Sequence, residues 1–433
     1  MKLKILGFLV YILVCIPIIQ GGKNYDFSLI FVNLIIAAIS VYSLFAKKQP
    51  FSLYKIFHIF ILFFFCIAPI LQYKDGIYMW GTIFTEEDYM EASLFTLFIV
   101  IFFNILYGFL YKRTRIKISS KSITPPKVIG TKKEWLLIAM SLFVCYCFLY
   151  INKFSITSLM FRGGEYVDRI DIGSTALLVI NNFLRPMPMI IFLAAYIVKT
   201  RHKIVLPILF ILMLISAPPT GMARFHVAAM YIPVFLCMFP VFQKGNRFTL
   251  LIIFGLLVIF PMLNMFRYGL IDGEIKLELN FDQFKDLNFD SYSMFMRVLK
   301  DDIVTFGRQL LGVLFFFVPR TMWPAKPIGS GAMIGEEMGF TMTNVSMPYF
   351  GEGYINFGVM GVILFVGFMA YILARYDKRY WSVDVYNKKS INVISYMMLF
   401  GLLLFMLRGD LMSSFAFMCG YICSFLFVKK VLL

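Results

Sequence analysis

Apolar runs of about 20 residues recur along the whole chain, and each is long enough to cross a bilayer as a helix. Hydrophobic residues make up 60% of the sequence and charged residues only 15%. Soluble domains contain about 45–50% apolar and about 25% charged residues. The sequence therefore predicts an all-α polytopic membrane protein, with residues 1–433 forming a single transmembrane domain.

The apolar runs predict about twelve transmembrane helices. Their expected positions are 4–20, 28–46, 53–72, 90–111, 134–151, 174–198, 204–217, 222–242, 248–266, 353–374, 391–407 and 411–428. The N-terminal run is followed by no small-residue cleavage pattern, so we interpret it as a first span and not as a removed signal peptide.

The positions of the charges orient these spans. If the N-terminus is cytoplasmic, most of the 41 Lys and Arg residues fall on the inner segments. The inner segments then contain only three acidic residues, Glu134, Asp377 and Asp384. This is the positive-inside pattern, and it predicts that both termini are cytoplasmic. The net charge of +17 therefore reflects topology and contact with anionic membrane lipid, and we predict no nucleic-acid partner.

Two polar segments are expected on the outer side. The first covers residues 152–173, and the second, larger loop covers residues 267–352. Within the larger loop, Leu279–Asp302 is mildly amphipathic and predicts one or two surface helices. The run Leu310–Val318 is too short to cross, even when extended back to Ile303, so it predicts an interfacial or re-entrant helix that ends at Pro319.

Arginines on the outer side are the strongest chemical signal. Arg pairs well with phosphate and carboxylate groups, and it is costly to hold at a membrane boundary without a function. Two of them adjoin interruptions in the apolar pattern: Arg224 follows the Pro218–Gly221 break, and Arg320 follows Pro319. The alternative is that each arginine only anchors its helix or pairs with a nearby acid. The full set is Arg162, Arg169, Arg224, Arg267, Arg308, Arg320 and Arg408.

Glu352 and His226 are the candidate bases. Glu352 lies where the large polar segment enters the next apolar run, and partial burial of such a carboxylate favours proton transfer. A structural pairing of Glu352 with Arg320 or Arg408 is the alternative. His226 is the only histidine expected on the outer side, two residues after Arg224.

The sequence contains no Walker A loop, no nucleophile elbow and no HExxH pattern. The outer segments also contain no Asp-x-Asp pair of the kind that binds a nucleotide sugar through a metal ion. We therefore expect no metal and no cofactor, and a lipid-diphosphate leaving group in preference to ATP or a nucleotide sugar.

Three motifs resemble the bacterial O-antigen polymerases, which polymerise oligosaccharide repeat units. The first is PPTGMAR, which ends at Arg224. The second runs from Pro319–Arg320 through Trp323–Pro324 to Lys326–Pro327, and the third is Gly351–Gly358. Two Arg-x10-Gly stretches, Arg162–Gly173 and Arg320–Gly331, are similar to a pattern in two periplasmic loops of that family.

The resemblance implies a glycosyltransferase-C-like fold in the inner membrane and an active site on the periplasmic face. The substrate would be an undecaprenyl-diphosphate-linked oligosaccharide, and a chain-length regulator protein would be a partner. In this interpretation Glu352, His226 and Arg320 are catalytic. The substrate-binding residues would be Arg162, Arg169, Arg224, Lys326, Arg408, Trp323 and Tyr354. Trp323, Tyr349 and Tyr354 would stack on sugars, although aromatic residues near an interface also serve as membrane anchors.

Two other functions share some of these features. An O-antigen ligase has the same architecture, but a histidine motif is expected in its large loop, and residues 267–352 contain no histidine. A lipid-linked oligosaccharide flippase would show two similar halves and charged central spans. We therefore predict a polymerase, with ligase and flippase as the alternatives.

Overall fold

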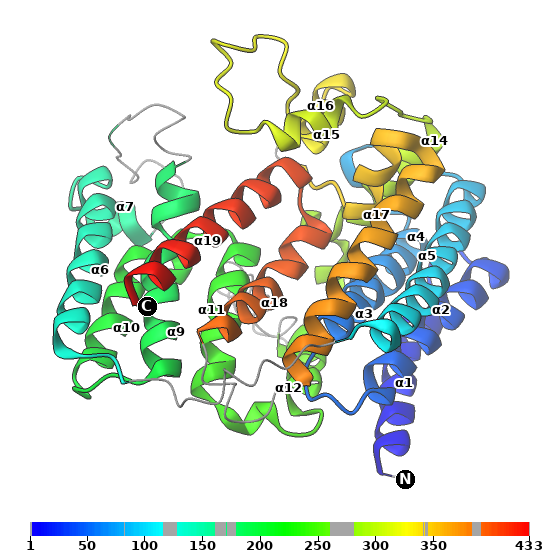
Figure 1. Cartoon of the computed structure of the whole chain (residues 1–433). Coiled ribbons are helices and arrows are strands. Elements are labelled where there is room, and N and C mark those ends of the chain that lie inside the picture. Colours follow the sequence, from blue (N-terminus) through cyan, green and yellow to red (C-terminus); the bar gives the residue numbers. More distant parts are fainter. Residues whose placement is uncertain are drawn as a thin grey trace, which may run out of the picture.

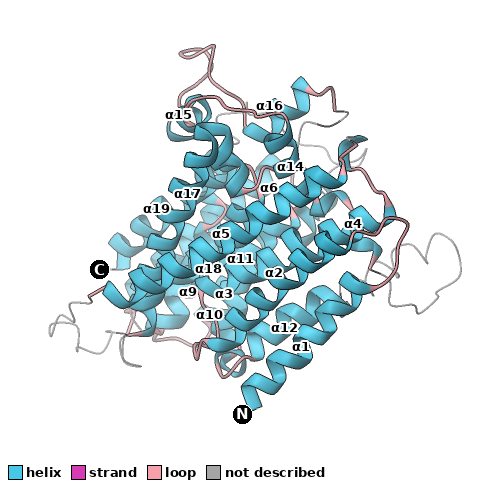
Figure 2. Cartoon of the chain, turned by 90° about the vertical axis from the view of Figure 1, so that its right-hand side faces the viewer, coloured by secondary structure: helices cyan, strands magenta, loops and turns pink. Residues whose placement is uncertain are grey.

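The computed structural model describes residues 2–81, 83–115, 128–160, 170, 179–259, 281–340, 342, 345–382 and 391–432. Within these residues the regular structure is helical, apart from one isolated bridge between Ile129 and Thr200. The helices pack side by side into a bundle, and the N-terminus lies at one end of it (Figure 1, Figure 2).

The elements follow one another along the chain with short connections. The first half contains α1 (Lys2–Ile19), α2 (Phe27–Ala46), α3 (Leu53–Leu62), η1 (Phe63–Ile67), α4 (Ala68–Asp75), α5 (Glu86–Arg113), α6 (Thr131–Ile151), α7 (Ile156–Met160), η4 (Ile180–Leu184) and α9 (Met187–Val198). The second half contains α10 (Val205–Ser216), η5 (Pro219–Gly221), α11 (Arg224–Met238), α12 (Arg247–Phe254), η7 (Gly255–Ile259), η8 (Asp282–Lys285), η9 (Leu287–Phe289), α14 (Ser291–Lys300), α15 (Arg308–Leu314), α16 (Ser330–Glu337), α17 (Tyr349–Trp381), α18 (Asn392–Arg408) and α19 (Leu411–Leu432).

Seven helical segments in the described residues are long and apolar enough to cross a membrane. Shorter apolar helices of 10–17 residues lie among them, including α10, α11 and α18. The expected class, an all-helical protein with many apolar helices of membrane-spanning length, is confirmed for the described part of the chain.

The continuous segment α3–η1–α4 is the centre of the bundle. Its apolar stretch is buried on all sides, as expected for a helix that is apolar around its whole circumference. Aromatic rings supply much of this packing: Phe57 stacks on Phe103 of α5 at 3.7 Å, and Phe65 meets Phe350 of α17 at 5.4 Å. The N-terminal start of α17 is therefore fixed against the core of the protein.

One carboxylate joins four helices at the end of the bundle where α3 begins. Asp377 of α17 accepts hydrogen bonds from the Leu53 and Tyr54 amides at 3.0 and 3.1 Å. It also accepts from the hydroxyls of Tyr107 and Tyr396, each at 2.7 Å. Four donors satisfy a carboxylate that is almost fully buried, so α3, α5, α17 and α18 are held together at this end.

Three short helices, α14, α15 and α16, gather at the end of the bundle opposite the N-terminus (Figure 1, Figure 2). They belong to the large polar segment expected at residues 267–352. The surface helix expected within Leu279–Asp302 is instead buried: α14 inserts Tyr292 and Phe295 among α4, α5 and α17 with no exposed surface. Its acidic neighbours lie at the two ends of the helix, which is why the segment as a whole looked like a surface element.

Helices α11 and α18 approach each other closely at a small residue. An ideal Cβ atom on Gly401 of α18 would lie 2.2 Å from the carbonyl oxygen of Ala229 in α11. Small residues allow helix backbones to pack this closely in membrane proteins. The contact fixes the start of α11, which carries Arg224 and His226, beside α18.

Replacing Gly401 by alanine should destabilise the protein, because the new methyl group overlaps the Ala229 carbonyl. Overpacking of this kind costs about 1–3 kcal/mol, so the thermal unfolding midpoint of the detergent-solubilised variant should fall. Gly108→Ala in α5 is the matched control, since its Cβ would meet nothing within 4 Å. Equal midpoints for the two variants would contradict the close contact.

Candidate functional site

The motif Gly351–Gly358 lies in a break near the start of α17. Every residue from 345 to 356 is buried. The helix is interrupted at Phe357 (φ −147°, ψ 27°) and Gly358 (φ 61°, ψ −148°). The positive φ of Gly358 suits glycine, and the carbonyls freed at the break are satisfied from outside the helix. The Thr305 and Gly307 amides donate to Ile355 and Asn356 at 2.6 and 2.9 Å.

Glu352 lies on the buried first part of α17 and has no exposed surface. Its carboxylate accepts a hydrogen bond from the Ser330 hydroxyl of α16 at 2.7 Å and another from the Leu411 amide of α19 at 2.8 Å. Among the described residues, no Arg or Lys lies within ion-pair distance of it. The expected structural pairing of Glu352 with Arg320 or Arg408 is therefore not present.

Asp410 is a second carboxylate beside Glu352, close enough for the two charges to interact. It accepts from the Ser413 amide of α19 at 3.1 Å and from the Gly331 amide of α16 at 3.3 Å. A Cβ atom on Gly329 would lie 2.4 Å from Asp410 Oδ2, so only glycine permits this approach. Asp410 thus caps the N-termini of two helices at once.

The N-terminal ends of α16, α17 and α19 converge on these two carboxylates. Helix N-termini present free amide groups and positive partial charge, which favours the charged form of the acids. Burial acts in the opposite direction and raises the pKa of Asp410 above its usual value of 3.8, although its backbone hydrogen bonds oppose the rise. A pair of buried carboxylates that share a site is an arrangement suited to holding and transferring a proton.

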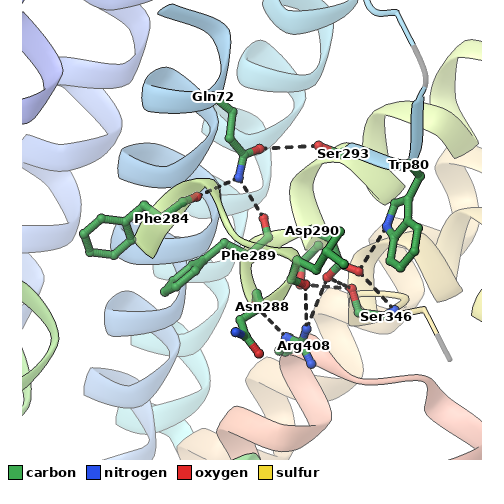
Figure 3. Close-up of polar contacts among 11 residues, drawn as sticks. Gln72, Trp80, Phe284, Asn288, Phe289, Asp290, Ser293, Ser346 and Arg408 are labelled. Atoms are coloured by element: carbon green, nitrogen blue, oxygen red, sulfur yellow. Dashed lines mark hydrogen bonds and ion pairs between the residues drawn. The ribbon is translucent and has the colours of Figure 1, made fainter. Parts of the chain in front are cut away.

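Arg408, two residues before Asp410, is committed to a different cluster (Figure 3). It donates from Nε to the Asn288 carbonyl at 3.0 Å and from Nη2 to Asp290 Oδ1 at 3.3 Å. Its guanidinium also lies over the ring of Phe225, 4.6 Å from the centroid. The substrate-binding role expected for Arg408 therefore competes with a set of intramolecular contacts.

Asp290 receives further donors in the same cluster. Trp80 Nε1 donates to it at 3.3 Å, and Ser346 donates from both its hydroxyl and its amide (Figure 3). Beside it, Gln72 Nε2 of α4 donates to the carbonyls of Phe284 and Phe289 at 2.8 and 3.1 Å. These contacts hold residues 284–290 between α4 and the α18–α19 turn.

Arg320 and Lys326 lie in the loop that follows α15, and they close it on itself. Arg320 is exposed and donates to the carbonyls of Lys326 and Pro327 at 2.7 and 3.3 Å. Lys326 Nζ donates to the carbonyls of Phe316 and Val318 at 2.5 and 3.0 Å. Burial, and then the neighbouring Arg320 cation, lower the pKa of Lys326. Arg320 keeps further N–H groups on the surface for a ligand.

The two aromatic candidates occupy different settings. Trp323 is half-buried in the same loop as Arg320. Tyr354 is buried on α17 and donates from its hydroxyl to Asp302 Oδ1 at 2.7 Å. Tyr354 is therefore placed to fix the α17 break, while Trp323 retains accessible ring surface for stacking.

His226 and Arg224 lie at the start of α11, after the expected break at Pro218–Gly221. His226 is almost fully buried, and its ring centroid lies 4.3 Å from that of Phe417 in α19. Arg224 is the first residue of α11, but its side chain lies outside the described part of the structure, as do Arg162 and Arg169 entirely.

The structure thus brings Glu352, His226 and Arg408 around one element, the α18–α19 turn. It also reveals Asp410, Asp290 and Ser330, which the sequence analysis did not assign to the site. The signal available was the polar turn Arg408–Gly409–Asp410 between two apolar runs. Among the described residues, no group of three or more His, Cys, Asp or Glu side chains forms a metal site.

A cavity of about 390 Å³ lies elsewhere, between α6, η4–α9 and α19. Its lining is apolar and includes Phe143, Phe183, Met187 and Phe427. None of the predicted site residues lines it, so this cavity does not connect the expected arginines.

The chain matches no family model, no curated protein and no solved structure. A function must therefore be argued from the residues and their geometry, together with the motif resemblance described above.

Replacing Asp410 by asparagine should flatten the pH dependence of stability. The raised pKa contributes stability that is fully present below pH 3.8 and is lost as the pH rises through the folded-state pKa. Asparagine caps helices about as well as aspartate but does not titrate. Thermal midpoints measured from pH 3.8 upward should fall more in the parent protein than in Asp410→Asn. Parallel curves would contradict the raised pKa, and Glu337→Gln, at an exposed site on α16, is the control.

Proposed function

We propose that this protein is a membrane glycosyltransferase that polymerises undecaprenyl-diphosphate-linked oligosaccharide repeat units of the O-antigen type. The observation that carries the proposal is the buried Glu352–Asp410 pair at the end of the bundle formed by the large polar segment. The same segment carries the exposed Arg320 and the half-buried Trp323. Proton-transfer groups, a phosphate-binding cation and a stacking surface are the groups that glycosyl transfer from a lipid diphosphate needs.

The proposed topology has about twelve spans in the inner membrane of a bacterium, with a glycosyltransferase-C-like arrangement and cytoplasmic termini. Contacts at both ends of the helices support it. Lys47, after α2, and Lys378 of α17 both lie over the ring of Tyr111 on α5, at 5.6 and 4.8 Å. At the other end, Asp88 of α5 pairs with Lys300 of α14 at 2.7 Å. Expected inner residues thus meet inner residues, and outer residues meet outer ones.

In the proposed reaction, a hydroxyl of the acceptor sugar attacks the anomeric carbon of the lipid-linked chain. The new carbon–oxygen bond forms as the bond from that carbon to the diphosphate oxygen breaks, and undecaprenyl diphosphate leaves with the electron pair. The hydroxyl proton passes to the Glu352–Asp410 pair. Because the pair is held by helix N-termini, it keeps its position while it accepts the proton.

Cations stabilise the negative charge that develops on the leaving diphosphate. Arg320 is placed for this by its two bonds to the loop backbone, which leave its remaining N–H groups outward. Arg224, Arg162 and Arg169 are proposed as further phosphate ligands from the neighbouring outer segments. Lys326 supports the loop that carries Arg320. His226 is proposed as a group that orients the acceptor.

Glu352 is covered by Ser330 and by the close-packed Gly329–Gly331 segment. Acceptor access therefore requires α16 to move away from the carboxylates. The hydrogen bonds involved are few, and each contributes about 0.5–1.5 kcal/mol when exchanged for solvent, so substrate binding can supply the energy of this opening.

Arg320→Ala and Arg224→Ala should each leave the protein inserted but stop chain extension. Loss of one charge-stabilising donor commonly costs on the order of 3 kcal/mol of barrier, which slows transfer about a hundredfold. A gel of surface polysaccharide from a complemented deletion strain would show short chains. Arg375→Ala, at an exposed position on α17, is the control. A normal long ladder from both variants would refute their roles.

Glu352→Gln should also abolish elongation, because glutamine keeps the size and hydrogen-bonding capacity of the side chain but does not accept the proton. The matched control is Glu336→Gln, an exposed carboxylate on α16. Membrane levels of the two variants, measured on an immunoblot, should be equal. Full-length polysaccharide from a well-expressed Glu352→Gln strain would exclude this carboxylate as the base.

The deletion strain itself separates the polymerase from the ligase. A lipid A–core that carries a single repeat unit indicates that ligation still occurs and that a polymerase is missing. A bare core would instead indicate a ligase or a flippase.

A further inference from the structure

An unpartnered apolar surface lies at the outer end of the bundle, on α15 and the loop that follows it. We call it the outer apolar face. Its most exposed members are Phe306, Met322 and Phe317, with 86%, 78% and 62% of their surfaces accessible. The complete face contains Phe306, Leu311, Leu314, Phe315, Phe317 and Met322. Contiguous exposed apolar side chains of this size mark a surface that is covered by another apolar phase.

This face is level with the ends of two helices of membrane-spanning length. Phe316 packs edge-on against Phe415, in the second turn of α19, with ring centroids 6.0 Å apart. A Cβ atom on Gly307 would lie 3.0 Å from the ring of Phe357, at the break of α17. Directly after the break, Val359 and Met360 are exposed. The outer apolar face therefore continues the exposed apolar surface of α17.

The backbone of the loop is suited to an apolar environment. Non-helical backbone enters a membrane interface only when its polar groups are satisfied within the protein. Here Lys326 binds two loop carbonyls and Arg320 binds two others. The loop thus supplies its own hydrogen-bond donors while its phenylalanines point outward.

Charge on this segment is positive. Arg308, at the start of α15, is exposed, and no described carboxylate lies within ion-pair distance of it or of Arg320. Exposed aromatic and aliphatic side chains beside cations are typical of segments that lie in the headgroup region of a bilayer.

We propose that Phe306–Met322 is a monotopic anchor whose outer apolar face inserts into the outer-leaflet interface, with Arg308 contacting phospholipid phosphate. This inference does not depend on the reaction that the protein catalyses. It assigns the bilayer as the occupant of the face and makes α15 a fixed element at the membrane surface, beside the loop that carries Arg320.

The test uses the full-length protein in nanodiscs made of phosphatidylcholine with brominated acyl chains. Phe317→Trp and Met322→Trp place new fluorophores on the face, and both positions are exposed, so the variants should fold. Glu336→Trp, at an exposed position on α16, is the matched control. The four native tryptophans give a background measured on the unchanged chain.

Groups buried about 5–10 Å into the headgroup–acyl boundary are within reach of the bromine atoms, so we expect about twofold stronger quenching in the two face variants than in the control. Including phosphatidylglycerol in the nanodiscs should strengthen the quenching, and Arg308→Gln should remove that gain. Quenching of Phe317→Trp and Met322→Trp no greater than that of Glu336→Trp would overturn the proposal and would leave the face in water or against a protein partner.

Discussion

The turn Arg408–Gly409–Asp410 between α18 and α19 carries two opposite charges one residue apart, and the outer end of the protein is assembled around them. Arg408 holds the 287–290 segment through two backbone carbonyls and Asp290. Asp410 holds the N-termini of α16 and α19. Because the two side chains serve different segments, a single short turn positions both the polar cluster of Figure 3 and the carboxylate pair that contains Glu352.

This arrangement explains why the outer segment is ordered next to Glu352 and projects freely elsewhere. Asp290 and Glu352 are almost fully buried, so each needs its hydrogen-bond donors to remain in the fold. The loop that carries Arg320 instead depends on bonds within itself. A firm base beneath a mobile-capable rim is a reasonable arrangement for binding a large saccharide above a fixed proton acceptor.

Much of the membrane-embedded architecture could be predicted from local sequence, because apolar runs and Pro-Gly interruptions act over a few residues. The buried helix α14 could not. Its apolar side chains Tyr292 and Phe295 are separated by polar ones, and only packing against α4 and α5 shows that all sides are covered. Likewise, Glu352 was recognised by its motif, while its partner Asp410 is distant in sequence. The pairing of Arg408 with Asp290 is long-range for the same reason.

The central claim is that this bundle extends a glycan on undecaprenyl diphosphate by using the residues gathered at its outer end. The most direct measurement adds the purified protein, in nanodiscs, to lipid-linked repeat units extracted from a strain that lacks it. The account predicts a ladder of longer lipid-linked glycans, with one undecaprenyl diphosphate released for each unit added. Unchanged repeat units in the presence of folded protein, or transfer only onto added lipid A–core, would contradict it.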